Sequence, residues 1–483
     1  MRWDSRLAPV AALLAGLTAP AWGGAARAES FVLLAPARGP GGEALTRPDP
    51  RGRSVPIATR LEGGPLAEHA RKILAGGFSA VLPDLDRQAR AATAPTECGG
   101  LGRSVLILFS DEDGGYARKG FFVKGEDGAT RFCGDHYIDL TVDEESLASG
   151  EFEEVLAHEF GHVLLRRLLG PIPATPSPIP ATPSRNFHSA LAITDPITAF
   201  DEGFGEHFQP VAARFTQTAG FRRRLEADAV PALADRWFSR QETWIRESWA
   251  PRGLLAFDKL ERWDREGGAY ERWMADETSS ALDACRLKSG SQMMASEAVA
   301  ASFFFDLINA REDAPGADRA AVAGAAENYR KLIVVLGRVG AWPKAAPLVA
   351  LARAWGERFP EDRARVTAVF LAVTYGGATS APVWRLNEAA ACRAALGDRD
   401  VFLAARAEAK AAGDHLASEG LAGRVALDAA LGPELWLADP AVGIPTAPWS
   451  KKRSEPLVLD LNTARGPALT LLFAKLPRPE ALA

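Results

Sequence analysis

The sequence is poor in the residues that mark the more specialised classes of protein. Its 483 residues include only 4 cysteines, 4 methionines and 7 histidines. Acidic residues outnumber basic ones by 61 to 56, so the basic excess typical of nucleic-acid-binding proteins is missing. Beyond the N-terminus, no stretch stays apolar for the ~20 residues that a membrane-spanning helix needs. These absences exclude a multi-span membrane protein and argue against nucleic acid as the main partner.

The remaining composition is that of a globular protein. Apolar residues make up 47% of the chain and charged residues 24%, which excludes a disordered or fibrous protein. A chain of 483 residues is too long for one ordinary core, so we expect two or three packed units.

The first residues have the pattern of a secretory signal peptide. Arg2 and Arg6 precede an apolar run that ends near Trp22, and Ala28 closes a small-x-small cleavage site. We expect cleavage after Ala28, with an uncleaved N-terminal anchor as the alternative. The mature protein should then be exported, periplasmic or secreted, with no stable membrane insertion.

The four cysteines are Cys98, Cys133, Cys285 and Cys392, and none belongs to a CxxC pair. In an oxidising compartment an even number suggests disulfides. Pairing the first with the second and the third with the fourth would keep each bridge within one region. Four buried free thiols are the alternative.

Residues 29–150 have the mixed pattern of a small α+β unit. Compact apolar runs bounded by turn residues predict strands at 104–109, 120–124 and 137–142. Helical periodicity predicts helices at 66–75 and 82–92.

The next helix carries the residues on which the functional interpretation depends. It begins with acidic residues near Glu151, ends before Gly170, and contains His158-Glu159-Phe160-Gly161-His162. Histidines at positions i and i+4 lie on one face of a helix, so both imidazoles can reach a single metal ion.

This HExxH spacing is typical of a zinc site with a catalytic glutamate. Zinc lowers the pKa of a bound water toward neutrality, and Glu159 could accept the proton as that water attacks a carbonyl. With only 7 histidines in the chain, a chance match is expected in well under about one in a hundred such sequences. Because two histidines leave zinc short of ligands, a third protein ligand must come from elsewhere.

The third ligand cannot be the histidine of a metzincin, because Leu165 and Leu168 stand where that motif needs glycine and histidine. No aspartate-ligand signature of the GTxDxxYG kind is present. Further along the chain, residues 201–207 read DEGFGEH. Gly203 and Gly205 lack side chains and would let this segment lie close against the HExxH helix, which favours Glu202 as the third ligand.

Together, HEFGH and DEGFGEH resemble the gluzincin zinc peptidases of the MA clan, in which a glutamate on a second helix completes the HExxH site. The resemblance covers residues 137–208. It implies that His158, His162 and Glu202 hold one Zn²⁺ ion and that Glu159 is the general base. The chain departs from the family pattern at His207, where a tyrosine is common.

Several residues remain alternatives for roles around the metal. Asp201 and Glu206 are candidates for a carboxylate that orients a ligand histidine. The donor to the oxyanion could be His188, His207 or Tyr270. If Glu202 is not the third ligand, the candidates are Glu206, Asp195, His188 and His207.

Between the two motifs, the heptapeptide PIPATPS occurs twice in tandem at residues 171–184. Proline has no backbone N–H, so this segment is expected to be a polyproline-like surface loop. A proline-rich docking motif is the alternative.

After residue 186 helical periodicity dominates. We therefore expect an α+β fold, in which a small mixed α/β N-terminal unit leads into the HExxH helix and a large mainly α-helical lobe follows. The predicted helices are 199–208, 220–237, 255–265, 291–309, 317–336, 361–374, 387–395 and 401–411. The expected boundaries are a signal peptide at 1–28, the α+β unit at 29–150, metal-binding helices at 151–220, the helical lobe at 221–445 and a C-terminal tail at 446–483.

These features predict an exported zinc-dependent peptidase whose substrate is a peptide or protein. The strand at 137–142 could bind an extended peptide by strand addition. A catalytically silent metal-binding scaffold, or a helical protein that binds a partner, is the alternative. Hydrolysis of a non-peptide amide or ester is a third reading. The sequence does not indicate the oligomeric state.

Overall fold

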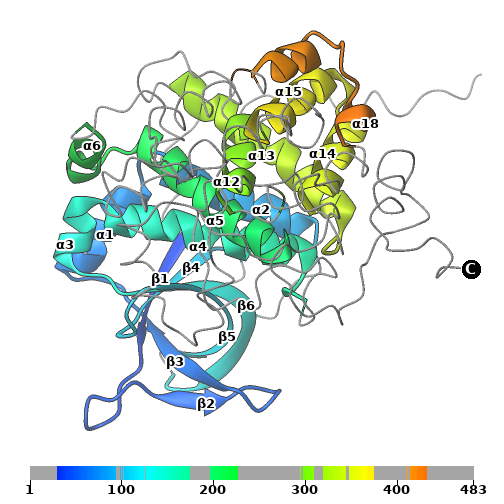
Figure 1. Cartoon of the computed structure of the whole chain (residues 1–483). Helices are drawn as coiled ribbons and strands as arrows, with labels where there is room; N and C mark the ends of the chain where they lie inside the picture. The colour runs from blue at the N-terminus through cyan, green and yellow to red at the C-terminus, as the bar shows by residue number, and fades with distance from the viewer. Residues whose placement is uncertain are drawn as a thin grey trace, which may run out of the picture.

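The computed structural model describes residues 30–93, 98, 101, 103–125, 127–173, 196–226, 294, 297–308, 319–343, 347–374, 411 and 414–431. In these residues a curved β-sheet lies at one end and a set of helices covers it (Figure 1). The predicted α+β class is confirmed. The predicted signal peptide, most of the proline repeat, Cys285, Cys392, the helices expected at 255–265 and 387–395, residues 401–410 of the helix expected at 401–411, and the C-terminal tail lie outside the described residues.

The sheet has the strand order β1-β4-β6-β5-β3-β2, and an additional antiparallel pairing of β1 with β3 closes it into a ring. β4 runs parallel to both β1 and β6, while β5 and β6 form a long antiparallel pair. The strands are β1 (Phe31–Pro36), β2 (Thr46–Pro48), β3 (Ser54–Arg60), β4 (Val105–Phe109), β5 (Gly115–Lys124) and β6 (Thr130–Leu140).

The ring explains why β4 is apolar along its whole length. Val105, Ile107 and Phe109 join the core that faces the helices. Leu106 and Leu108 face the other way, into a second core. A strand covered on both faces reads as a continuous apolar run rather than as an alternating one.

The second core lies inside the ring, since it draws side chains from all the strands that close it. A disulfide between Cys98 and Cys133 belongs to this core and ties the segment after α2 to β6. The first of the two expected pairings is thereby confirmed. The strand residues of this core are Leu34, Ala58, Leu106, Leu108, Phe121, Cys133 and Tyr137.

The predicted strand at 137–142 is the end of β6, and here one expectation is wrong. β6 pairs with β4 along one edge and with β5 along the other. Both edges are therefore occupied, so a peptide cannot be added to this strand.

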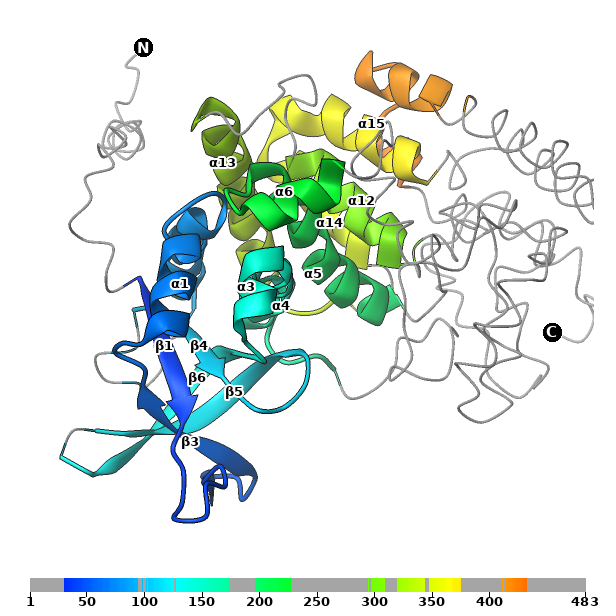
Figure 2. The ribbon, with the colours of Figure 1, turned by 90° about the vertical axis from the view of Figure 1, so that its left-hand side faces the viewer.

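The helices cover the sheet in successive layers (Figure 2). α4 packs on β5 and β6, α5 packs on α4, α12 packs on α5, and α15 packs on α12. One hydrophobic core runs through these layers, from Leu33 on β1 to Leu431 after α18. The helices are α1 (Pro65–Leu74), α2 (Leu82–Ala91), α3 (Glu144–Ser149), α4 (Glu151–Leu169), α5 (Pro196–Phe215), α6 (Ala219–Glu226), α12 (Glu297–Ile308), α13 (Arg319–Val339), α14 (Pro347–Arg358), α15 (Arg363–Val373) and α18 (Leu427–Ala430), with 3₁₀ turns η1 (Ser79–Val81) and η3 (Pro360–Asp362).

None of the described helices is long and apolar enough to cross a membrane.

A buried network of two arginines and two aspartates fastens α4 to α2 and to the sheet. Arg167 on α4 contacts Asp135 on β6 at 2.7 Å and Asp86 on α2 at 3.3 Å, and its side chain is only 4% exposed. Arg90 on α2 contacts the same two aspartates. Burial alone would raise the pKa of Asp135, but Arg167 and Arg90 outweigh it and lower this pKa. The four charges balance, which makes their burial tolerable.

Replacing Arg167 by methionine should destabilise the protein by about 3–5 kcal/mol, because it leaves an unbalanced buried carboxylate. The control is Arg87→Met. It breaks the pair with Asp84, whose side chains are 56% and 32% exposed, and should cost less than about 1 kcal/mol. Denaturant unfolding measures both. Equal, small losses in the two variants would contradict the structural role assigned to the network.

Candidate metal centre

Three potential metal ligands meet where α4 packs against α5. His158 and His162 project from successive turns of α4, and Glu202 projects from α5. Their Nε2 atoms are 3.1 Å apart, and Glu202 Oε2 lies 3.7 Å from His158 Nε2 and 3.3 Å from His162 Nε2. Within the described residues this is the one group whose ligand atoms converge in this way.

The spacing suits a small tetrahedral ion. Ligand atoms about 2.0–2.1 Å from a tetrahedral zinc lie roughly 3.3–3.4 Å from one another. The three observed separations, 3.1, 3.3 and 3.7 Å, bracket that value. Two imidazole nitrogens and one carboxylate oxygen also match the donor set of catalytic zinc sites, which keep a fourth position open.

Glycines allow the two helices to approach closely at this point. A Cβ atom at Gly205 would lie 3.0 Å from both His158 Cε1 and His162 Nε2, and one at Gly161 would lie 3.0 Å from Gly205 Cα. The sequence interpretation assigned this contact to Gly203 as well, which is wrong. A Cβ at Gly203 would meet the carbonyl of Glu297 at 2.6 Å, so Gly203 serves the packing of α5 on α12.

Asp201 stands behind the second histidine. Its Oδ1 lies 3.2 Å from His162 Nδ1, and its Oδ2 accepts a hydrogen bond of 2.9 Å from Arg166. A hydrogen bond from Nδ1–H to this carboxylate would leave the lone pair of Nε2 facing the ligand cluster. Of the two candidates for an orienting carboxylate, Asp201 therefore has the required contact. Glu206, one turn further along α5, is buried but is not in the ligand cluster.

The electrostatic field of the cluster favours a cation. Burial opposes charge on His162, but the carboxylates of Asp201 and Glu202 outweigh it and raise the pKa of this histidine well above its usual value. Burial likewise raises the pKa of Asp201, whereas His162 and Arg166 lower it overall. The same field that stabilises a proton on the imidazole would stabilise a bound metal ion.

Glu159 follows the first histidine and is 8% exposed. Its side chain packs against the start of β5, where a Cβ at Gly115 would lie 3.2 Å from Glu159 Cγ. The side chain next to the first ligand histidine thus lies close to a strand of the sheet.

His207 does not fit the roles that the sequence left open for it. Its Nδ1–H donates to the carbonyl of Phe204, and Tyr329 donates its hydroxyl to Nε2 at 3.0 Å. Both ring nitrogens are therefore occupied, with no proton left to donate to an oxyanion and no lone pair for a metal. Burial lowers the pKa of His207 to about 3, so the ring stays neutral. Its 0% exposure makes it a core residue.

The other residues proposed from the sequence, Asp195, His188 and Tyr270, lie outside the described residues.

The buried neutral His207 predicts an acid-sensitive fold. Its pKa is about 3 in the folded state against 6.5 in the unfolded chain, so the unfolded state binds more protons between these values. Its contribution to stability is complete above pH 6.5 and is lost as the pH falls toward 3. His207→Phe should reduce the slope of unfolding free energy against pH in this window by up to ~1.4 kcal/mol per pH unit.

A second variant separates the hydrogen bond from the burial. Tyr329→Phe removes the hydroxyl that stabilises the neutral ring, so the pKa of His207 should rise and the slope should fall in part. Some slope remains in both variants, since burial lowers the pKa of His136 to about 3 as well. Denaturant unfolding at several pH values gives the slopes. Identical slopes for the parent and His207→Phe would refute the assignment.

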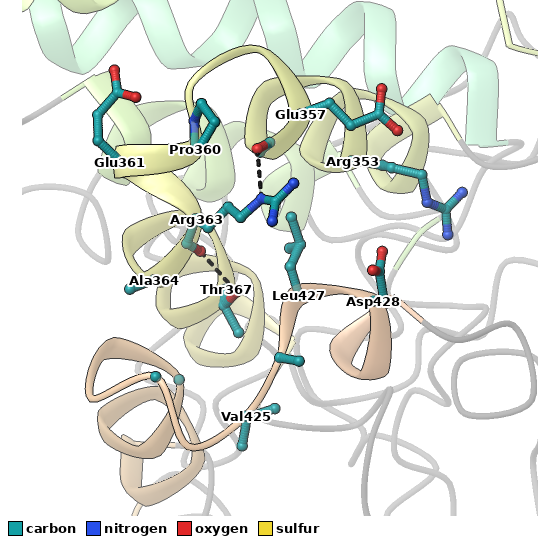
Figure 3. Close-up of a pocket in the computed structure, with 14 residues that line it drawn as sticks. Arg353, Glu357, Pro360, Glu361, Arg363, Ala364, Thr367, Val425, Leu427 and Asp428 are labelled. Carbon is teal, nitrogen blue, oxygen red and sulfur yellow. Dashed lines mark hydrogen bonds between the residues drawn. The ribbon is translucent and has the colours of Figure 1, made fainter. Parts of the chain in front are cut away.

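A surface pocket of about 450 Å³ lies elsewhere, between α14, η3, α15 and the segment before α18 (Figure 3). Its lining mixes charges of both signs, and Arg363 Nε donates to the carbonyl of Gly356 at 2.8 Å. No candidate metal ligand lines this pocket, so it is separate from the site on α4 and α5.

Comparisons with known proteins returned no match to a family model, to a curated protein or to a solved structure.

Proposed function

We propose that the chain is an exported zinc-dependent peptidase, with one Zn²⁺ held by His158, His162 and Glu202. The observation that carries the proposal is the convergence, within 4.8 Å, of two imidazole nitrogens from α4, the helix that also bears Glu159, and one carboxylate oxygen from α5. The donor set and its spacing favour zinc over calcium or magnesium, which take oxygen ligands at longer or more numerous positions.

The chemistry follows from the roles of these side chains. When bound, zinc would supply Lewis acidity and lower the pKa of a coordinated water toward neutrality. In this proposal Glu159 accepts a proton from the attacking water and passes it to the leaving nitrogen. Asp201 holds His162 in the tautomer that presents Nε2 to the ion. His207 takes no part, and the donor to the oxyanion is not assigned.

The edge of β5 is the place where an extended peptide would bind. Thr141 N–H donates to the carbonyl of Gly114, so the backbone groups of Gly115 and Ala117 point away from β6. β3 pairs with β5 only at Phe122 and Val123. In the described residues, the first half of β5 thus has an open edge beside Glu159, and strand addition there favours a polypeptide substrate.

The zinc content of the purified mature protein tests the proposal. We expect about one zinc per chain, lost or sharply weakened in Glu202→Ala. Glu327→Ala is the control. It removes a carboxylate on α13 whose side chain is 60% exposed. If the unsubstituted protein binds no zinc when zinc is supplied, the proposal is wrong and a partner-binding helical protein is favoured. If Glu202→Ala retains zinc, another residue must be the third ligand.

Glu159→Gln separates a catalyst from a silent metal-binding scaffold. The amide keeps the shape of the side chain but cannot accept the proton, so zinc should be retained while peptide hydrolysis falls by about 10²–10⁴-fold. Zinc analysis and turnover of a peptide and ester panel are measured on the same preparation. Undiminished hydrolysis in this variant would show that Glu159 is not the base. Turnover of esters alone would exclude the peptidase.

A further inference from the structure

We infer that Arg166 is a positioning residue, which ties the open edge of β5 to the carboxylate that orients His162. The inference rests on the proposed function and adds to it a residue outside the HExxH and DEGFGEH motifs. Arg166 lies on α4, one turn after His162, and its side chain is 22% exposed.

The guanidinium bridges two elements at once. Its Nη1 donates to the carbonyl of Ala117 on β5 at 3.0 Å, and its Nη2 donates to Asp201 Oδ2 on α5 at 2.9 Å. A planar fork presents donors on separate nitrogens at fixed spacing and can bridge two such acceptors, whereas a lysine donates all its hydrogen bonds from one nitrogen. One side chain of α4 thus sets the relative position of β5 and α5.

On the metal side, Arg166 acts through Asp201. The carboxylate of Asp201 is 0% exposed, and His162 and Arg166 are its two partners of opposite charge. With Oδ2 held by Arg166, Oδ1 faces His162 Nδ1 at 3.2 Å. Without the arginine, a buried carboxylate would keep only one partner and would be free to turn away from the ligand.

On the substrate side, Arg166 contacts an acceptor on the edge of β5. The carbonyl of Ala117 points to the open edge, and a carbonyl oxygen has two lone pairs. It can therefore accept from Arg166 and from a peptide N–H at the same time. The bond from α4 fixes the edge at a set distance from Glu159, which packs under the same strand.

The test compares Arg166→Met and Arg166→Lys with Arg330→Met. The control removes an arginine that bridges α13 to Asp84 on α2 and is 38% exposed, far along the chain from the ligands. Zinc affinity is measured by competition with a chelator, and KM and kcat are measured on extended peptides. Arg166→Met should lose about tenfold or more in zinc affinity, as expected when the support of a ligand histidine is removed, and should raise KM. Arg330→Met should change neither.

Arg166→Lys and a double variant keep the inference testable if the methionine variant does not fold. The lysine should retain more zinc affinity than methionine, since it restores a charge beside Asp201, while KM stays raised. The double variant Arg166→Lys/Asp201→Asn should have the same zinc affinity as Asp201→Asn alone, because the arginine acts through that carboxylate.

The outcomes distinguish this inference from the function on which it rests. A parent that binds zinc and cleaves peptides, with Arg166 variants matching Arg330→Met, would overturn the positioning role alone. A KM that falls would show Arg166 competing with the substrate for the Ala117 carbonyl, which also overturns it. A parent without zinc or hydrolysis would remove both the function and this role.

Discussion

The contact between α4 and α5 at Gly161 and Gly205 is the constraint on which the rest of the site depends. Helices normally lie 8–10 Å apart, at a distance set by the side chains between them. Here no Cβ stands between the axes, and any Cβ at Gly205 would press on both histidines at 3.0 Å. Glu202 can reach the histidine pair only because this separation is short. The convergence of the three ligand atoms therefore depends on the packing of α4 against α5 as much as on the spacing of the ligands in the sequence.

Close packing concentrates charge, and the structure balances it with arginines. Asp201 and Glu202 stand beside His162, and Arg166 pairs with the first of them. The next residue along α4, Arg167, pairs in the same way with Asp86 on α2 and Asp135 on β6. The two networks tie α4 to α5, to α2 and to strands β5 and β6, which keeps the histidines in place between the sheet and α5. A buried charge left without such a partner would cost several kcal/mol.

The sequence was sufficient for those parts of the site that are local. The HExxH helix, its end at Gly170 and the second motif can be read from spacing and capping. α4 lies where it was expected, and α5 (Pro196–Phe215) contains the helix expected at 199–208 and extends it at both ends. Long-range placement was not readable in the same way. β3 contains Pro56, which interrupts its strand pattern, and β1 pairs with strands distant in sequence, so neither was predicted. Arg166 shows no motif, because its two partners are on other elements.

The expectation that a peptide adds to the strand at 137–142 was wrong for the same reason, since long-range strand order could not be read from the sequence. A bulge in β5 determines where the pairing of β5 with β3 begins. Strand order decides which edges are free, and the sequence does not state that β6 is central. β5 is irregular between Lys119 and Phe121, where Gly120 has a φ of +87°, a conformation that favours glycine. Beyond the bulge β5 pairs with β3 at Phe122 and Val123, and no β3 pairing is found before it among the described residues. A bulge re-aims a strand by bending it. Among the described residues, the first half of β5, with Gly115 and Ala117, is therefore without a second paired strand, and the side chain of Arg166 contacts it there.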